Sequence, residues 1–230
     1  MRRPVMGVRG GADHNAWLYT TSFLPSDLPN LVAWYRLGIG LTNDGGGLIS
    51  KWADQSGNGN DLTATTTRRP TLQGDNSLLF NGTSNDMQVA FTLNYPMSVF
   101  LRVKPVTWSD NLYITDSGPS VGSGMGIVQS GSTPDLYLHS GTLTMANSNA
   151  TLGSWHGLGA VFNAASSKFK IDSTTQVTGN PGNKNPAGLT LGSFAGHALN
   201  SNIYVKELCL YSDAKSDADI QSIIDYLNTL

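Results

Sequence analysis

The chain is 230 residues long, with 39% hydrophobic residues, 13% charged residues and a formal net charge of −2. This length suits one large domain, and a near-neutral chain without a basic stripe argues against a nucleic-acid-binding protein. We expect no membrane insertion, because no apolar run approaches the roughly 20 residues of a membrane-spanning helix. The 26 glycines are typical of a fold with many tight turns.

Residues 1–24 are expected to form an N-terminal arm outside the main domain, which we place at residues 25–230. The arm shows no hydrophobic periodicity, and its glycines interrupt any regular element. Such a segment can serve in assembly, docking on other copies of the chain or on partner proteins. It can equally be a frayed end or an extra edge strand. No apolar stretch follows Arg2-Arg3, so we expect no signal peptide.

From Leu31 onward the sequence is typical of short strands separated by turns. Apolar and polar residues alternate clearly at 97–104 and 167–172. Many short strands joined by tight turns predict a β-sandwich or jelly roll. The expected strands are 31–36, 48–52, 61–65, 77–81, 86–92, 97–104, 111–115, 125–130, 135–139, 142–146, 155–163, 167–172, 174–178, 188–194 and 202–211.

The C-terminal segment predicts one helix. Ser216 can cap it, and Asp217 and Asp219 fall in the first turn, where the helix dipole favours acidic residues. The apolar residues that follow are spaced i, i+3, i+4 and i+7, so they form one stripe that can pack on the sandwich. They are Ile220, Ile223, Ile224 and Leu227.

The stretch from Trp52 to Leu62, WADQSGNGNDL, is a turn dense in Asp, Asn, Ser and Gly. Its polar side chains can bond the local backbone, and its glycines can adopt positive φ. It follows LVAWYR at 31–36 and precedes Arg69-Pro70-Thr71 and LLFNG at 78–82. This order resembles the start of laminin-G-like domains of the concanavalin-A-like lectin/glucanase superfamily, in their bacterial and phage members.

The second half of the chain strengthens this resemblance. WHGLGAVFN at 155–163, LTLGS at 189–193 and KELCLYS at 206–212 are similar to later segments of the family, in the same order. One departure is Ile171-Asp172-Ser173, which stands where the family has a V-D-G turn. The resemblance covers residues 31–230 and implies an all-β fold: a two-sheet antiparallel jelly-roll sandwich of the concanavalin-A-like type with a short C-terminal helix.

The acidic residues bear on catalysis. Glycoside hydrolysis uses two carboxyl groups across the scissile bond, and glucanases of this superfamily carry paired glutamates in an E-x-D-x-x-E pattern. The chain has a single glutamate, Glu207, and no such pattern. We therefore predict that the chain is not an enzyme. A divergent polysaccharide lyase is the open alternative, because Tyr137 and His139 lie two apart on an expected strand and would face the same side.

Aromatic residues in loops and on strand faces are candidates for sugar contact, because flat rings stack on sugar faces. We select Trp108, Tyr113, Tyr137 and His139 as the ligand-binding set, with Trp108 as the most exposed candidate. The bland alternative for Trp108 is that it covers a loop edge. The other tryptophans of the main domain are expected in the core: Trp34, Trp52 and Trp155.

A weak calcium candidate lies in the first turn motif. Asp54, Ser56 and Asn58, followed by a glycine, match the first half of an oxygen-rich calcium loop. The bidentate glutamate of such a loop is missing, so an Asx-rich turn satisfied by its own backbone is the alternative. No other cofactor is expected. The single cysteine, Cys209, is expected to be a buried strand residue.

These observations favour a structural and binding module. Our leading hypothesis is a phage virion component, such as a capsid decoration, fibre or tail adhesin protein, assembled in the host cytoplasm. Its expected partners are other virion proteins or its own copies, through the arm, and cell-surface polysaccharide. Two alternatives stay open at this point: a free lectin-like carbohydrate-binding module and a divergent polysaccharide lyase.

Overall fold

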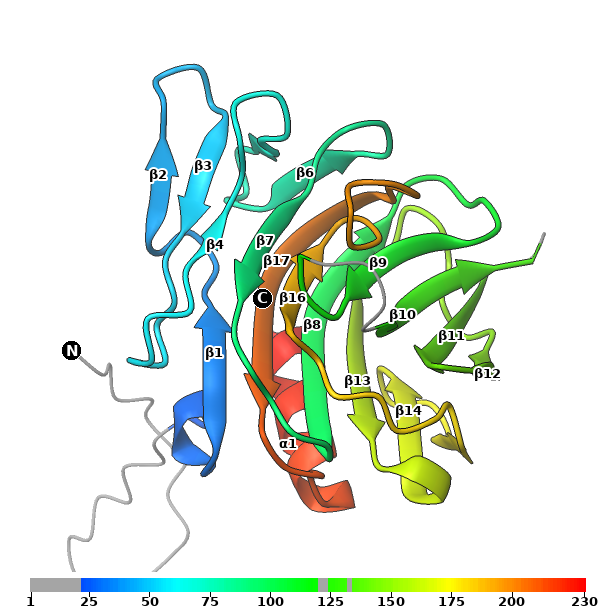
Figure 1. The fold of residues 1–230 in the computed structure, drawn as a ribbon. Helices are drawn as coiled ribbons and strands as arrows, with labels where there is room; N and C mark the ends of the chain where they lie inside the picture. Colours follow the sequence, from blue (N-terminus) through cyan, green and yellow to red (C-terminus); the bar gives the residue numbers. More distant parts are fainter. Residues whose placement is uncertain (1–21, 120–123, 132–133) are drawn as a thin grey trace, which may run out of the picture.

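The computed structural model describes residues 22–119, 124–131 and 134–230, which fold into two antiparallel β-sheets packed face to face (Figure 1). The predicted all-β sandwich with a C-terminal helix is confirmed. No helix in this part of the chain is both long enough and apolar enough to cross a lipid bilayer. Two 3-10 turns complete the elements, η1 (Pro25–Asp27) and η2 (Ala164–Ser166).

The eight-stranded sheet has the last strand of the chain near its centre. Because β1 (Leu31–Tyr35) pairs with that strand, the first and last strands of the fold lie against each other. In spatial order the remaining strands are β15 (Val177–Gly179), β14 (Ser167–Ile171), β13 (His156–Phe162), β8 (Met97–Pro105), β17 (Asn202–Tyr211), β6 (Leu78–Asn81) and β5 (Thr71–Leu72).

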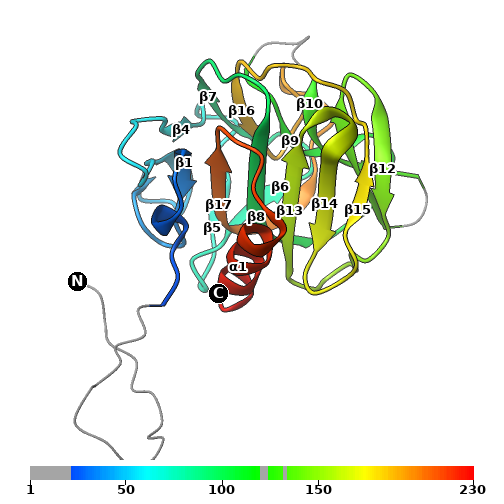
Figure 2. The same ribbon diagram turned by 90° about the horizontal axis from the view of Figure 1, so that it is seen from below.

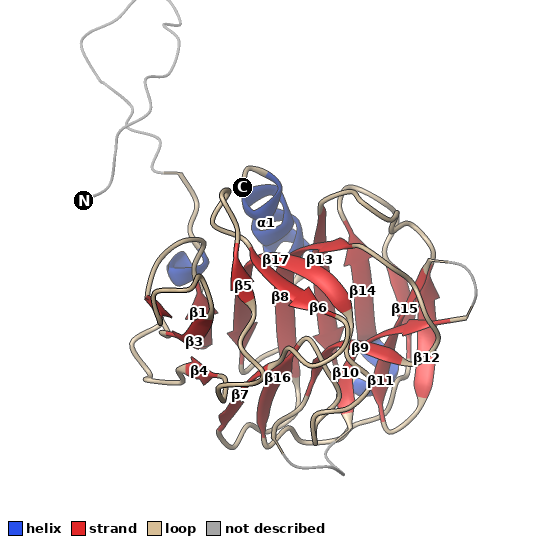
Figure 3. Ribbon diagram, turned by 90° about the horizontal axis from the view of Figure 1, so that it is seen from above, coloured by secondary structure: helices blue, strands red, loops and turns tan. Residues whose placement is uncertain are grey.

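The nine-stranded sheet forms the second layer (Figure 3). Its strands alternate between core-facing apolar residues and outward residues, as the burial pattern of β11 illustrates. In spatial order they are β12 (Leu143–Asn147), β11 (Asp135–Ser140), β10 (Met125–Ser130), β9 (Leu112–Asp116), β16 (Gly188–Leu191), β7 (Met87–Ala90), β4 (Leu62–Thr63), β3 (Ile49–Trp52) and β2 (Leu41–Asn43).

Helix α1 (Asp217–Asn228) begins as predicted. Ser216 caps it, and the Ser216 and Asp219 side chains satisfy each other's backbone N–H groups. The helix covers the outer side of the eight-stranded sheet (Figure 2). Its apolar stripe is buried there in a second core, together with Trp34, Phe100 and Tyr211. Strand β13 is therefore buried along its whole length, between this second core and the main one.

Several expectations about single residues can be compared with the structure. Trp34 and Trp52 are buried, as predicted, and so is Cys209. The prediction for Trp155 was wrong: it lies just before β13, is half-buried and belongs to neither core cluster. The sequence reading also missed β2 and β5, which are too short to show alternation.

Most of the expected arm, residues 1–21, lies outside the described residues. Its last residues are described, and Phe23 and Leu24 pack against the core beneath α1. The Phe23 ring stands edge-on to Tyr226 of the helix, with 6.3 Å between ring centroids. Any truncation that removes Phe23 therefore removes a contact of the folded domain.

Candidate functional site

The outer faces of the two sheets differ in what covers them. Helix α1 and the segment around η1 pack on the eight-stranded sheet. On the nine-stranded sheet, one set of side chains from the central and distal strands points away from the main core, and we call this side the open face; Thr115, Val128 and Thr190 on it are buried, and the other members are half-buried. Its members are Gln88, Tyr113, Thr115, Val128, Asp135, Tyr137, His139 and Thr190.

Strand register brings the predicted aromatic residues of the open face together. Val128 pairs with Tyr113 on one side and with Tyr137 on the other, so these three residues lie abreast across β9, β10 and β11. His139 lies two residues beyond Tyr137 on the same face, and its ring stands perpendicular to Tyr113 at 6.3 Å between centroids. Three of the four predicted binding residues therefore form one cluster.

A β-bulge sets the geometry beneath this cluster. The pairing of β10 with β9 shifts register between Ile127 and Val128, and the chain beside the shift approaches β9 closely. A Cβ atom added to Gly126 would lie 1.9 Å from the carbonyl oxygen of Thr115. Gly126 also pairs with His139 across the β10–β11 ladder. Because Gly126 has no side chain, β10 can approach β9 closely at this point. His139 is positioned by its pairing with Gly126.

A loop adds a fourth ring that sequence reasoning missed. Phe194 lies in the segment 192–201 and packs edge-on against Tyr113, with 5.0 Å between centroids. The backbone N–H of Ala195 donates a 2.8 Å hydrogen bond to Oδ2 of buried Asp116. We refer to Tyr113, Tyr137, His139 and Phe194 as the aromatic cluster. Their contacts depend on tertiary placement, so no local pattern signals Phe194.

The far end of the same loop is held by a second buried aspartate. Asp86 Oδ1 lies 3.0 Å from Nδ1 of His197, and Asp86 Oδ2 lies 2.7 Å from a guanidinium nitrogen of Arg68. Two buried carboxylates at different points of the loop therefore fix the position of Phe194. His197 is thus one of the residues that anchor the loop.

Burial dominates the electrostatics of the cluster. It lowers the pKa of His139 below the ordinary 6.5, with Asp116 opposing this shift and Lys184 adding to it. Burial also raises the pKa of Tyr113, and the nearby charge of Asp116 adds to that rise. The pKa of Asp116 itself is raised by burial, against the hydrogen bonds that it accepts. His139 is therefore a neutral imidazole at pH 7, able to donate at one nitrogen and accept at the other.

Polar atoms on the open face lack partners within the described part of the chain. They include Nδ1 of His139 and Oδ1 of Asp135 on β11, and Nε2 of Gln88 on β7. Buried polar groups in proteins are nearly always hydrogen-bonded, to the protein, to water or to a ligand. His139 and Asp135 lie on either side of Tyr137 along one strand face. The ring of Tyr137 is therefore flanked by two polar side chains, each with one buried atom that has no hydrogen-bond partner among the described residues.

Trp108, the fourth predicted binding residue, is placed differently. Its ring is half-buried and packs against the main core between the sheets, and its Nε1 is covered. The expectation of an exposed loop tryptophan was wrong, and the alternative of a ring that covers a loop edge describes it better. None of the ring contacts found among the described residues joins Trp108 to the aromatic cluster.

The calcium candidate forms a hydrogen-bonded turn. Oδ1 of Asp54 accepts the backbone N–H groups of Trp34 and Ser56, while Oδ2 accepts the Ser56 hydroxyl and the N–H of Asn60. The side-chain nitrogen of Asn58 donates to the carbonyl oxygens of Leu31 and Val32 at 2.9 and 3.1 Å. The motif thus fastens the turn to β1. Calcium binding by Asp54, Ser56 and Asn58 stays a prediction.

Two sets of side chains of types common in catalysis make hydrogen bonds that hold the fold together. Glu207, the single glutamate, is buried and accepts hydrogen bonds from Trp34, Leu37 and Tyr226. On the same sheet, Nδ1 of His156 lies 2.7 Å from Asp172.

Thr151 completes a Thr–His–Asp series with these last two residues. Its hydroxyl lies 3.2 Å from Nε2 of His156. That nitrogen also accepts the backbone N–H of Thr151 at 2.9 Å, so the lone pair that would take a hydroxyl proton already accepts a hydrogen bond.

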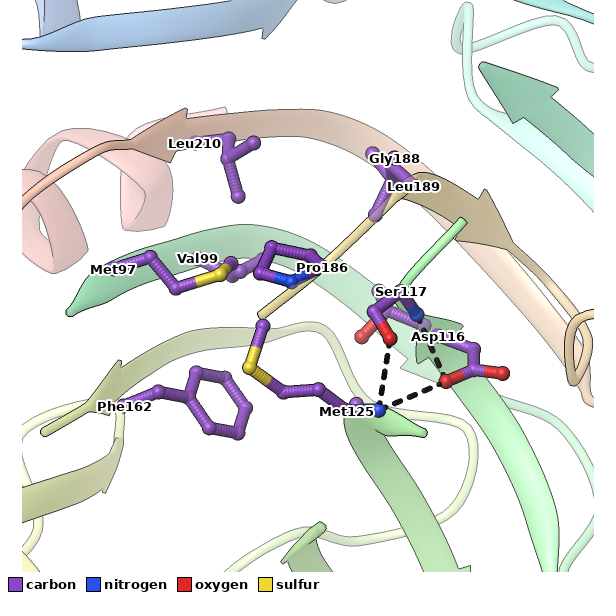
Figure 4. Close-up of a pocket in the computed structure, with 12 residues that line it drawn as sticks. Met97, Val99, Asp116, Ser117, Met125, Phe162, Pro186, Gly188, Leu189 and Leu210 are labelled. Atoms are coloured by element: carbon purple, nitrogen blue, oxygen red, sulfur yellow. Dashed lines mark hydrogen bonds between the residues drawn. The ribbon is translucent and has the colours of Figure 1, made fainter. Parts of the chain in front are cut away.

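A small hollow lies between the sheets beside Asp116 (Figure 4). Met97, Phe162 and Leu210 line it from one sheet, and Met125 and Leu189 from the other. It has room for about one water molecule, far less than a sugar ring occupies. This hollow therefore has no room for a sugar ring.

No protein-family model matches the sequence, and no curated protein matches it either. Solved structures do resemble the fold. Trypanosoma rangeli sialidase matches with a TM-score of 0.63 and 13% identity, over 86% of this chain and 33% of the sialidase chain. This chain therefore spans about a third of the length of that protein.

Two further structures resemble the chain at similar strength. Domain 4 of AbnA, an extracellular GH43 arabinanase from Geobacillus stearothermophilus, in complex with arabinotriose, has a TM-score of 0.64 and 18% identity, covering 85% of this chain and 98% of that domain. A GH54 α-L-arabinofuranosidase has a TM-score of 0.63 and 14% identity, covering 78% and 50%. At these identities the likeness establishes a shared β-sandwich fold.

These neighbours correct one prediction. All three are glycosidases or a domain of one, which contradicts the prediction, drawn from the missing carboxylate pair, that the chain is not an enzyme. Paired glutamates are the pattern of one group of glucanases with this fold. Other glycosidases use other catalytic groups, so the single glutamate of this chain does not exclude an enzyme. The comparisons establish that this chain is a two-sheet antiparallel β-sandwich of a kind found in glycosidases.

Proposed function

We propose that the chain is a carbohydrate-binding β-sandwich whose binding site is the aromatic cluster of the open face. The observation that carries the proposal is the row of Asp135, Tyr137 and His139 on one face of β11, with Tyr113 abreast on β9. Aromatic rings supply apolar surface for the C–H groups of a sugar. The polar side chains of His139 and Asp135 flank Tyr137 on the same strand face and are the nearest candidates to bond the hydroxyls of the sugar.

The neighbouring structures support the choice of ligand class. One of them is a domain of an arabinanase in complex with arabinotriose, and this chain covers nearly all of that domain. An exposed strand face suits an extended oligosaccharide, which can lie across several strands. Arabinotriose is therefore the first probe, followed by an array of neutral and acidic oligosaccharides.

The test is isothermal titration calorimetry with the full chain and two variants. Tyr137→Ala should weaken binding about tenfold, the loss of one central aromatic anchor. Tyr95→Ala is the matched control, because Tyr95 is a half-buried tyrosine that packs against the main core and lies outside the aromatic cluster. Equal affinity of the two variants, or no binding to any sugar of the array, would contradict the proposal.

A finer family assignment rests on the sequence. We propose that the chain belongs to the laminin-G-like group of concanavalin-A-like domains, which the order of its motifs from LVAWYR to the final helix supports. Placement in a phage virion stays a prediction from the same resemblance. Mass spectrometry of purified particles tests it, and finding the protein only free in lysate would count against it.

The aromatic cluster also keeps the lyase alternative open. Tyr113 and His139 contact each other, and a neutral imidazole can accept a proton beside a uronate carboxylate. Such a reaction produces an unsaturated uronate with its own ultraviolet absorbance. Absence of that absorbance over a panel of uronate polymers would dismiss the lyase.

A further inference from the structure

A second group of aromatic residues lies on the opposite sheet, at the edge of the area that α1 covers. Lys104 of β8 and Tyr204 of β17 are directly paired across the strands, and Trp155 stands edge-on to Tyr204 with 6.4 Å between centroids. Lys206 lies two residues beyond Tyr204 on the same face. We call Lys104, Trp155, Tyr204 and Lys206 the lysine–aromatic site. The function proposed above does not use it.

The two lysines are held in place by the rings. Nζ of Lys104 lies 5.0 Å from the Trp155 ring centroid and 4.2 Å from that of Tyr204. Nζ of Lys206 lies 4.7 Å from the same Trp155 centroid. Both ammonium groups are therefore gathered around one indole by cation–π contacts. An ammonium group that is already ordered loses less side-chain entropy when it binds an anion.

The charge of this group is incompletely neutralised. Lys206 faces Asp75 at 3.8 Å and donates to the carbonyl oxygen of Leu230. Lys104, in contrast, has no carboxylate within ion-pair distance among the described residues. Most of the described ammonium groups on this protein, such as those of Lys51, Lys168 and Lys215, do have one. The ammonium group of Lys104 is half-buried, held against two rings and free of a carboxylate partner in the described part of the chain, so it is well placed to bind an anionic group.

We propose that the lysine–aromatic site binds an acidic polysaccharide, through the carboxylate or sulfate groups of its sugars. The ammonium groups of Lys104 and Lys206 bind the anionic group, and the rings of Trp155 and Tyr204 contact the apolar side of the sugar. A nucleic acid is the poorer fit, because a backbone with many phosphates calls for a basic stripe and this site has two lysines.

The test uses affinity gel electrophoresis of the full chain at low ionic strength, with polygalacturonate in the gel. Lys104→Gln should weaken the retardation about tenfold, because it removes one charge-assisted contact. Lys170→Gln is the matched control, since Lys170 is a half-buried lysine on β14 of the same sheet and away from both rings. This control should stay within about twofold of the wild type. Raising the salt to 0.5 M should abolish the difference between the two variants.

The outcomes separate this site from the aromatic cluster. Retardation that Tyr137→Ala abolishes and Lys104→Gln leaves unchanged would move the acidic ligand to the open face and overturn the proposal. Equal effects of Lys104→Gln and Lys170→Gln would show that the acidic polymer binds by general charge attraction, which would also overturn the proposal. Absence of retardation by polygalacturonate and by a sulfated polymer, or stronger retardation by single-stranded DNA, would refute it. Arabinotriose binding is measured separately, so either site can fail alone.

Discussion

The indole Nε1 of Trp34 donates a 2.6 Å hydrogen bond to Oε1 of Glu207, which joins the first strand of the fold to the last. The same oxygen accepts the hydroxyl of Tyr226 on α1 at 2.6 Å. Oε2 accepts the backbone N–H of Leu37. One carboxylate thus connects β1, β17 and the helix. In the sequence, Glu207 stands out only as the single glutamate and therefore as a candidate catalytic residue. Its role in joining these elements is visible only in the structure.

Replacing Glu207 by alanine should lower the free energy of unfolding by about 3 kcal/mol or more, because three donors lose their acceptor in a buried place. Urea unfolding followed by fluorescence measures the loss. Asp225→Ala is the control, since Asp225 accepts an exposed hydrogen bond from Gln221 on the same helix. Equal losses in the two variants would contradict the structural role of Glu207.

Glu207 should also contribute a pH dependence. Burial raises its pKa above the ordinary 4.5, against the hydrogen bonds from Tyr226, Trp34 and Leu37. The folded state therefore binds the proton more tightly than the unfolded chain does. This contribution to stability is fully present below pH 4.5 and is lost as the pH rises through the folded-state pKa. The free energy of unfolding of the wild type, relative to that of Glu207→Gln, should therefore decrease as the pH rises. A difference that does not change with pH would refute the prediction.

His139 should give a dependence of the opposite sign. Its pKa is lowered in the fold, so the unfolded chain takes up the proton first as the pH falls. The stability that the neutral imidazole provides is present above pH 6.5 and is lost as the pH falls through the folded-state pKa. Urea unfolding of the wild type and of His139→Gln between pH 8 and pH 5 measures this. The other histidines are common to both proteins, so the difference isolates His139.

Gly126→Ala should destabilise the fold by about 3 kcal/mol, because the added Cβ overlaps the backbone of Thr115. It should also disturb the place of His139 and weaken arabinotriose binding. Gly74→Ala is the matched control: its Cβ meets no atom within 4 Å and its backbone is not in the positive-φ region. A Gly126→Ala protein as stable as the control would show that the strands can separate there at little cost.

Asp54→Ala should cost about 2 kcal/mol or more, since it removes the acceptor of several backbone N–H groups at the turn. Thermal melting of the wild type with and without a chelator is the companion measurement. An unchanged melting temperature would leave Asp54 as a backbone acceptor and dismiss calcium. A drop caused by the chelator, restored by added calcium, would establish the ion site.

Local signals predicted the parts of the fold that depend on local chemistry. Helix α1 was predictable from the Ser216 cap and the apolar spacing, because both act within a few residues. The long strands β8 and β17 were predictable from length and alternation. Strands β2 and β5 were missed, because pairs or triplets of residues become strands only through partners elsewhere in the chain.

The candidate site was predictable only in part. Tyr137 and His139 could be placed on one face from their spacing within a strand. Their contact with Tyr113 and Phe194 depends on the register of other strands, on a bulge and on a loop held by buried aspartates. Trp155 was predicted to lie in the core from its position in the family motif. In the structure it contacts Lys104 and Lys206, which come from strands far from it in the sequence. Sequence spacing carries no information on such contacts.

The contact between Phe23 and Tyr226 brings the start of the described domain against its C-terminal helix. Together with the β1–β17 pairing, it places the two ends of the domain beside each other. A short linker could therefore join these ends, and the chain could be reopened at an exposed turn of either sheet. Such a circular permutant would keep both sheets intact. By the same geometry, this sandwich could be inserted into a loop of a host protein without separating the two sides of that loop.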